Sequence, residues 1–133
     1  MKTIESAGGI LIKDKRILLC KRSIQEKRFP RCWGCPAGKR EGQELFNELA
    51  VREVKEESGF DFIPKELFGI YEMDLRDVRV ISHLYLGTFS GEINFDKDEV
   101  EECQWFTYNG TKELTLSFFY EKVISDLYQK GLI

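Results

Sequence analysis

Apolar residues in the first part of the chain form two short runs separated by a polar turn. The first run covers residues 4–12, with small residues at its centre, and the second covers residues 17–20. Short apolar runs that are bounded by polar clusters are typical of strands. The pattern therefore predicts a β-hairpin at the start of the chain, with residues 13–16 as its turn.

The pattern changes to a helical period between residues 43 and 58. The apolar side chains of this segment share one helical face and belong to Leu45, Phe46, Leu49, Ala50 and Val54. Ser58-Gly59 is typical of the end of a helix. The segment just before it is punctuated by Pro36, Gly38 and Gly42 and is expected to be irregular.

The second half of the chain repeats the sequence of strands followed by a helix. The expected strands cover residues 60–63, 67–73, 78–89 and 103–108, and the expected helix covers residues 116–129. Strands, helix, strands and helix in this order predict a mixed sheet flanked by helices, an α/β fold, rather than a regular β-α-β winding.

The composition supports one globular domain over residues 1–133. The chain has 133 residues, of which 42% are hydrophobic and 13% aromatic, enough for one core. The net charge of −3 argues against general affinity for nucleic acid or anionic membranes. No apolar run resembles a secretory signal or reaches the length of a membrane span, so we expect a cytoplasmic protein.

The four cysteines are too few and too scattered for a disulfide scaffold. Cys32 and Cys35 have the C-x-x-C spacing of some zinc and redox sites. A zinc site needs a second pair of ligands, and no other pair has suitable spacing. A redox motif normally begins a helix, whereas Pro36-Ala37-Gly38 follows here. We therefore expect structural or incidental roles for these cysteines.

Acidic residues gather in two clusters, one within residues 41–57 and one within residues 96–102. Glu53, Glu56 and Glu57 stand at positions i, i+3 and i+4, so they share one face of the predicted helix. Like charges repel there, and three carboxylates held together favour a hard divalent cation such as Mg²⁺ or Mn²⁺. A solvated acidic face on a surface helix would show the same three residues.

The residues around the three glutamates decide between these interpretations. The motif consists of Gly38, Glu44, Arg52-Glu53-Val54, Glu56-Glu57 and Gly59-Phe60. Its spacing resembles the Nudix box, G-x5-E-x7-R-E-U-x-E-E-x-G-U with U apolar, at every defined position. Residues 33–39 look like the W-x-x-P-G-G-K approach of the family, with Ala37 in place of the first glycine, and residues 99–106 look like its E-V-x-W-F strand.

This resemblance implies the Nudix α/β/α sandwich and a hydrolase of nucleoside diphosphates linked to another moiety, dependent on a divalent metal. It implies Glu53, Glu56, Glu57 and the backbone carbonyl of Ala37 as metal ligands. One glutamate would act as general base, and Glu53 is the first candidate. Glu102 is expected to complete the site, with Glu99 as the alternative, unless this second cluster is only an exposed acidic turn.

The resemblance also gives roles to residues outside the metal ligands. Arg52 and Glu44 are expected to form an ion pair that holds the loop against the helix. Gly38 and Gly59 are expected to allow backbone geometries that a side chain would hinder. Substrate phosphates need basic partners, and the best placed by resemblance are Arg22 and Lys39.

The box indicates a reaction class but not a substrate. Pro64 is the only proline after the box, and it is too close to serve as the mark of the ADP-ribose branch. Tyr71 is nearer, and Tyr85 farther, than the tyrosine of the diadenosine-polyphosphate branch. These observations favour a minimal MutT-like enzyme that cleaves a (d)NTP to a monophosphate and pyrophosphate. Hydrolysis of nucleotide sugars, dinucleoside polyphosphates or RNA ends remains an alternative.

Two other classes of Nudix-fold protein are also considered. Isopentenyl diphosphate isomerases usually show an altered box, and non-catalytic ligand-binding modules commonly lose box glutamates. The complete box in this chain argues against both. Family members are often homodimers, but no apolar stripe in this sequence requires a partner.

Overall fold

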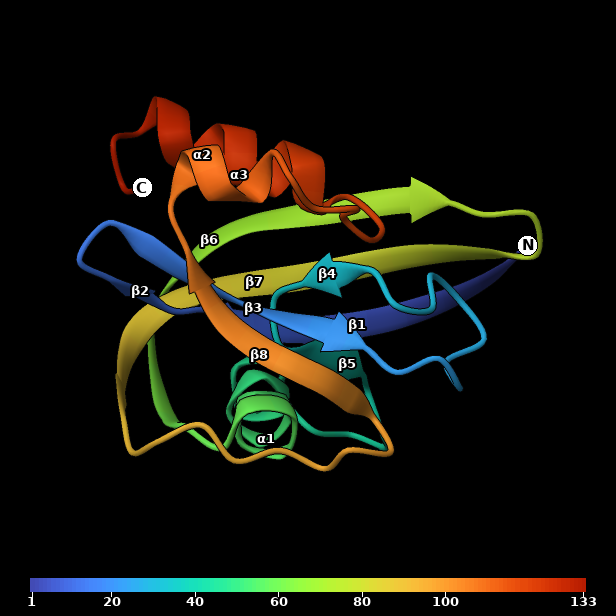
Figure 1. Cartoon of the computed structure of the whole chain (residues 1–133). Helices are drawn as coiled ribbons and strands as arrows, with labels where there is room; N and C mark the ends of the chain where they lie inside the picture. Colours follow the sequence, from blue (N-terminus) through green and yellow to red (C-terminus); the bar gives the residue numbers. More distant parts are fainter.

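The computed structural model describes residues 1–133 and consists of two sheets with helices on both sides (Figure 1). One sheet has the order β5-β1-β7-β6 and contains β1 (Lys2–Ile10), β5 (Ala37–Lys39), β6 (Asp61–Asp74) and β7 (Val78–Ser90). The other contains β2 (Ile12–Lys13), β3 (Arg16–Arg22), β4 (Trp33–Gly34) and β8 (Val100–Phe106), which pairs with β3. The helices are α1 (Phe46–Ser58), α2 (Tyr108–Thr111) and α3 (Tyr120–Gln129).

The predicted hairpin is present as β2 and β3, which pair antiparallel from Ile12 opposite Ile17. Its turn residues Asp14 and Lys15 have φ angles of 52° and 61°, as a tight hairpin turn requires. β1 continues directly into this hairpin but belongs to the other sheet, where it runs parallel to β7 over its whole length.

Two apolar clusters hold α1 and α3 on opposite sides of the sheets. Leu49, Ala50 and Val54 of α1 are buried in a cluster with residues of β1 and β3. Val123 and Leu127 of α3 are buried in a second cluster around β3 and β7. Each fully buried leucine or valine contributes about 2 kcal/mol to folding. The predicted α/β class, with a mixed sheet flanked by helices, is confirmed.

The helices begin later than their apolar patterns predicted. α1 begins at Phe46 rather than residue 43, because Leu45 is extended with ψ of 155° and its N–H donates to the Glu48 carboxylate at 2.9 Å. α3 begins at Tyr120 rather than residue 116. Phe118 has a φ of 47°, which lies outside the right-handed helical region.

Several strands and one turn also differ from the prediction. Residues 61–74 form one strand, β6, whose register shifts between Pro64 and Glu66 and again between Leu67 and Gly69. These irregularities explain why the sequence reads as two strands. The short strands β4 and β5 lie in the segment that was expected to be irregular. The strand expected over residues 103–108 is β8, which ends at Phe106, and α2 begins at Tyr108.

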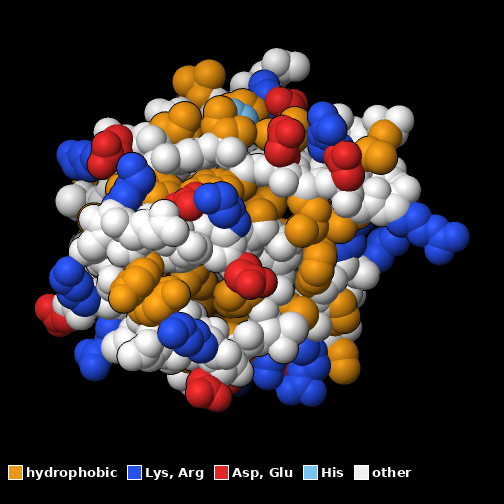
Figure 2. Space-filling view, turned by 90° about the horizontal axis from the view of Figure 1, so that it is seen from above, with side chains coloured by type: hydrophobic (Ala, Val, Ile, Leu, Met, Phe, Trp, Pro, Cys, Tyr) orange, Lys and Arg blue, Asp and Glu red, His pale blue; other side chains and the backbone are white.

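Charges of both signs are interspersed with apolar side chains on the face formed by α2 and α3 (Figure 2). Here Lys122 pairs with Asp126 at 2.6 Å, and Tyr108 stacks on Tyr128 with ring centroids 3.7 Å apart. That stacking joins α2 to α3. None of the helices has the length and apolar character needed to cross a membrane.

Candidate active site

The predicted site residues line a cavity of about 490 Å³ between α1, β5 and the start of α3. Its acidic residues are Glu26, Glu41, Glu53, Glu56, Glu57 and Glu99. Its basic residues are Arg22, Lys27, Arg28 and Lys39. The structure thus brings the three box glutamates and both predicted phosphate-binding residues to one cavity.

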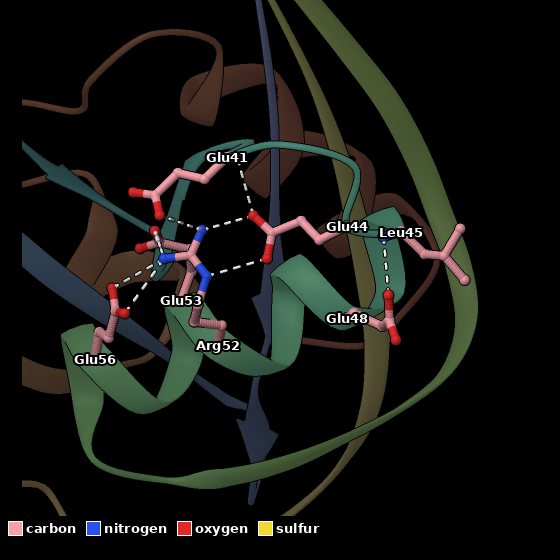
Figure 3. A network of polar contacts seen from close by, with 7 residues as sticks. All are labelled: Glu41, Glu44, Leu45, Glu48, Arg52, Glu53 and Glu56. Atoms are coloured by element: carbon pink, nitrogen blue, oxygen red, sulfur yellow. Dashed lines mark hydrogen bonds and ion pairs between the residues drawn. The ribbon is translucent and has the colours of Figure 1, made fainter.

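Arg52 is the centre of an ion-pair network that joins α1 to the preceding loop (Figure 3). Its Nη2 and Nε donate to the two oxygens of Glu44 at 2.7 and 3.1 Å. Its Nη1 donates to Glu53 and to Glu56, each at 3.2 Å. The hydrogen bonds from Arg52 lower the pKa of Glu44 to about 2, helped by the bond from the Glu41 N–H. The predicted Arg52–Glu44 pair is therefore present, and the same guanidinium contacts two box glutamates.

Glu53 is buried, with 7% of its surface exposed, and its carboxylate lies against the backbone of Gly38. A Cβ atom added at Gly38 would lie 2.3 to 2.5 Å from the carboxylate atoms, closer than any side chain tolerates. Burial, and then the charge of Glu56, raise the pKa of Glu53 to about 7 although Arg52 opposes the shift. Any side chain at position 38 would therefore displace the Glu53 carboxylate.

Glu57 is held in place through both its side chain and its backbone carbonyl. Its Oε1 accepts a hydrogen bond from the Ala37 N–H at 3.0 Å. Its backbone carbonyl accepts weak hydrogen bonds from the thiols of Cys103 and Cys20 at 3.3 and 3.8 Å. Burial, and then the charge of Glu53, raise the pKa of Glu57 well above its usual range.

Ala37 occupies the position at which the family pattern has glycine, and the space it needs is left by Gly8. The two residues are directly opposite in the β1–β5 pair. A Cβ added at Gly8 would lie 2.4 Å from both the Ala37 Cβ and the Pro36 carbonyl oxygen. The alanine at position 37 is therefore accommodated without displacing β5, because Gly8 leaves room for its Cβ.

The helix end is formed as the motif implies. Gly59 has a φ of 91°, and its N–H donates to the Lys55 carbonyl at 3.0 Å. Only glycine adopts this conformation without strain. An added Cβ would also lie 2.5 Å from the backbone of Asn94, so Gly59 allows the 91–99 loop to lie against the helix end.

The two predicted phosphate-binding residues have different surroundings. Arg22 donates from Nε to the Arg28 carbonyl at 2.9 Å and from Nη2 to Glu26 at 3.2 Å, so it also braces the loop after β3. Lys39 is exposed at the cavity rim, and no carboxylate lies within ion-pair distance of it. Lys39 is therefore the more readily available cation.

The second acidic cluster contributes Glu99, not Glu102, to the cavity lining. Glu102 accepts a hydrogen bond from the side chain of Gln104, two residues along the same strand face. Cys103, the next residue, faces α1 and donates to the Glu57 carbonyl, so Glu102 points to the opposite side of β8. The expectation that Glu102 enters the site is corrected, and its alternative Glu99 takes that place.

All four cysteines are free thiols, and Cys32 and Cys35 share no common site. Cys35 is buried beneath the cavity, whereas Cys32 lies in the loop after β3 and is partly exposed. Cys20 and Cys103 face each other across β3 and β8, with sulfur atoms 3.1 Å apart. Their packing agrees with the structural role expected from the sequence.

The chemistry of the side chains fits a divalent cation. Glu53, Glu56, Glu57 and Glu99 face one cavity. The charges of Glu53, Glu56 and Glu99 each raise the pKa of at least one other glutamate of this set, so a cation would relieve their repulsion. As the side chains stand, no three acidic, histidine or cysteine groups lie close enough together to hold an ion. Arg52 Nη1 bridges two of the glutamates instead.

Some residues of the cavity were not singled out in the sequence. Glu41 lies at its edge, 4.0 Å from Arg52, and Phe119 and Tyr120 form the wall opposite α1. Glu41 could have been identified from the sequence, because it lies between Gly38 and Glu44 of the box. The aromatic residues lie more than fifty positions from it, so only the fold brings them there.

Comparison with known proteins agrees with this geometry. The family model described as NUDIX domain matches residues 2–127. The ADP-ribose pyrophosphatase of Methanocaldococcus jannaschii is 38% identical over 124 residues, which cover 91% of this chain and 70% of that protein. A MutT NUDIX hydrolase from Burkholderia pseudomallei has a similar structure, with a TM-score of 0.85, 25% identity and coverage of 94% of this chain and 98% of that one. The MutT protein from Methanosarcina mazei Go1 has a TM-score of 0.87 at 22% identity, covering 98% and 96% of the two chains.

Proposed function

Because the chain belongs to the Nudix family, whose members act on phosphoric anhydride bonds, we propose that it hydrolyses a nucleoside diphosphate linked to a sugar, of the ADP-ribose class. The observation that carries hydrolysis is the convergence of the box glutamates, Lys39 and Arg22 on one cavity. The observation that favours this substrate class is the 38% identity to an ADP-ribose pyrophosphatase over most of both chains.

Glu53, Glu56 and Glu57, with the Ala37 carbonyl and Glu99, are the residues that would hold Mg²⁺ or Mn²⁺. When bound, such an ion neutralises phosphate charge and lowers the pKa of a water molecule. The protein arranges these ligands. Gly38 has no side chain and so leaves room for the Glu53 carboxylate, and the Ala37 N–H orients Glu57 by a hydrogen bond. Arg52 keeps Glu53 and Glu56 directed toward the same side of α1.

Proton transfer and phosphate binding fall to different residues. Glu53 is the first candidate for the general base, because its carboxylate faces the cavity from a buried position. Lys39 at the rim and Arg22 on the opposite strand supply positive charge to the two phosphates of the substrate. The pyrophosphate would therefore lie between α1 and the end of β3.

A (d)NTP is the second candidate substrate. No proline stands at the position that marks the ADP-ribose branch, and the structurally similar MutT hydrolase from B. pseudomallei is 25% identical. Cleavage would then give a nucleoside monophosphate and pyrophosphate. The cavity lining serves both candidates, because both present a pyrophosphate to the same carboxylates.

A substrate panel tests this proposal. Purified protein is incubated with ADP-ribose, a UDP-sugar, dATP, 8-oxo-dGTP and a dinucleoside tetraphosphate, each with Mg²⁺ or Mn²⁺, and the products are separated by chromatography. AMP and ribose 5-phosphate from ADP-ribose support the first proposal, and pyrophosphate from a triphosphate supports the second. Failure to cleave any compound would favour a ligand-binding module.

A further inference from the structure

Tyr120, the first residue of α3, lies in the wall of the cavity opposite the box glutamates. Its surface is 4% exposed, so the ring is enclosed by protein while one part of it reaches the cavity. No element of the Nudix box includes this residue. Its place in the site results from the docking of α3 on the sheets.

Gly34 of β4 fixes the position of the Tyr120 ring. A Cβ added at Gly34 would lie 2.7 Å from ring atoms Cδ2 and Cε2, so this edge of the ring packs against the strand where only glycine leaves room. Ser117 ties the approach to α3 to the same strand, because its N–H and Oγ both donate to the Trp33 carbonyl, at 2.9 and 3.2 Å. The Tyr120 N–H in turn donates to the Ser117 carbonyl at 3.0 Å. The ring is thus preorganised without a ligand.

The hydroxyl of Tyr120 is an unused donor that opens on the cavity. It makes no hydrogen bond within the protein, whereas the hydroxyl of Tyr71 donates to Asp126 at 2.8 Å. The fully enclosed side-chain atoms without a partner are Arg40 Nε and His83 Nδ1. Tyr120 Oη is not one of these atoms, so it keeps some exposed surface, and Tyr120 lines the same cavity as Glu57 and Arg22.

We propose that the Tyr120 hydroxyl donates a hydrogen bond to a phosphate oxygen of the bound substrate and so holds the pyrophosphate against the box glutamates. This inference rests on the proposed function. A phenol is protonated at neutral pH and can donate, and a phosphate oxygen can only accept. The Tyr120 hydroxyl has no partner within the protein, and a phosphate oxygen entering between Tyr120 and Glu57 would accept its hydrogen bond.

The test uses Tyr120→Phe, which keeps the ring on Gly34 and removes only the hydroxyl. Binding of inorganic pyrophosphate in the presence of Mg²⁺ is measured by calorimetry, together with kcat and KM for the compound cleaved most efficiently in the substrate panel. We expect pyrophosphate affinity to fall about 10-fold or more, because the loss of one hydrogen bond to a charged group weakens binding by about this factor. KM should rise in parallel while Tm stays at the wild-type value.

Tyr108→Phe is the matched control, because Tyr108 stacks on Tyr128 away from the cavity. It should bind pyrophosphate as the wild type does. Wild-type affinity in Tyr120→Phe would overturn the proposal, and so would a wild-type protein that binds no pyrophosphate. If the wild type binds pyrophosphate but cleaves no compound, the proposed function fails, and the binding data alone decide the role of Tyr120.

Discussion

Arg52 grips the carboxylate of Glu44 with two parallel hydrogen bonds, 2.7 Å from Nη2 and 3.1 Å from Nε. The pair joins α1 to the loop that follows β5, and the remaining nitrogen of the guanidinium contacts Glu53 and Glu56. Arg52 therefore both attaches the loop to α1 and positions two carboxylates of the site. A substitution that keeps its positive charge but changes its shape can test the importance of this geometry.

Arg52→Lys keeps the positive charge but removes the planar fork that matches a carboxylate. We expect kcat/KM to fall about 10-fold or more, because a bidentate pair of this kind is lost from the support of the site. Tm should fall as well, because the loop loses its attachment to α1. Arg79→Lys is the matched control: Arg79 makes a similar two-bond contact with Asp74 at 2.7 and 3.3 Å, away from the cavity. Its activity should equal that of the wild type, and equal losses in both variants would contradict the assignment.

Acid titration should expose the contribution of Glu44 to stability. Its pKa of about 2 in the folded protein is below the ordinary value of 4.5, so the contribution is complete above about pH 4.5 and disappears as the pH falls toward 2. We expect Glu44→Gln to have a lower Tm than the wild type at pH 7, and the difference to shrink across that window. The measurement is differential scanning calorimetry of both proteins between pH 7 and 2.5. A difference that stays constant with pH would show that the carboxylate charge is not involved.

Glu53→Gln and Glu57→Gln should each lower metal-dependent hydrolysis about 10²- to 10⁴-fold, because each removes a charge from the proposed metal site and Glu53 is also the candidate base. Both should remain folded, since glutamine has nearly the same shape. Steady-state kinetics with Mg²⁺ and circular dichroism check the two statements. Glu66→Gln, on the exposed edge strand β6, serves as control. Full activity of either box variant would refute the mechanism.

Glu99→Gln and Glu102→Gln separate the two candidates of the second acidic cluster. Glu99 lines the cavity and Glu102 bonds to Gln104, so only the Glu99 variant should require more metal. We expect the Mg²⁺ concentration for half-maximal activity to rise about 10-fold in Glu99→Gln, because one anionic oxygen ligand is lost. The check is a Mg²⁺ titration of initial rate at saturating substrate. A shift in Glu102→Gln alone would restore the expectation from the sequence.

Gly38→Ala should damage activity more than stability. The added Cβ would lie within 2.5 Å of the Glu53 carboxylate, which is the end of a flexible side chain and can turn away. We expect kcat/KM to fall at least 10-fold with a change in Tm of a few degrees, because the backbone can keep its course while the carboxylate moves. Gly110→Ala, where the nearest atom to the added Cβ is 3.3 Å away, should leave kcat/KM unchanged. Wild-type activity in Gly38→Ala would show that Glu53 is not held by this approach.

The sequence was informative where function depends on spacing within one helix. Glu53, Glu56 and Glu57 share a face whenever residues 46–58 are helical, so their convergence needed no tertiary information. The Arg52–Glu44 pair joins the helix to the preceding loop, and it was expected from the resemblance of the motif to the Nudix box. Periodicity also gave the hairpin and the α/β class.

The remaining features of the fold and of the site depend on contacts between distant parts of the sequence and could not be predicted from local patterns. Glu99 precedes β8, whereas Glu102 lies within it beside Cys103, so which of the two reaches the cavity depends on how β8 pairs with β3. The strands β4 and β5 are two and three residues long and exist through their partners β3 and β1. The contact of Tyr120 with Gly34 joins positions that no local pattern connects.

The parallel pairing of β1 with β7 has a consequence for how the protein is made. β1 occupies residues 2–10, and its long partner ends at residue 90, so before β7 has been translated β1 can pair only with the short strand β5. α1 packs on β1 and on β6, so its apolar face also lacks a complete surface until β6 has been translated. The box glutamates of α1 are therefore translated before β6 and β7, the strands that complete their surroundings. We therefore expect hydrolytic activity only from chains in which the β5-β1-β7-β6 sheet is complete.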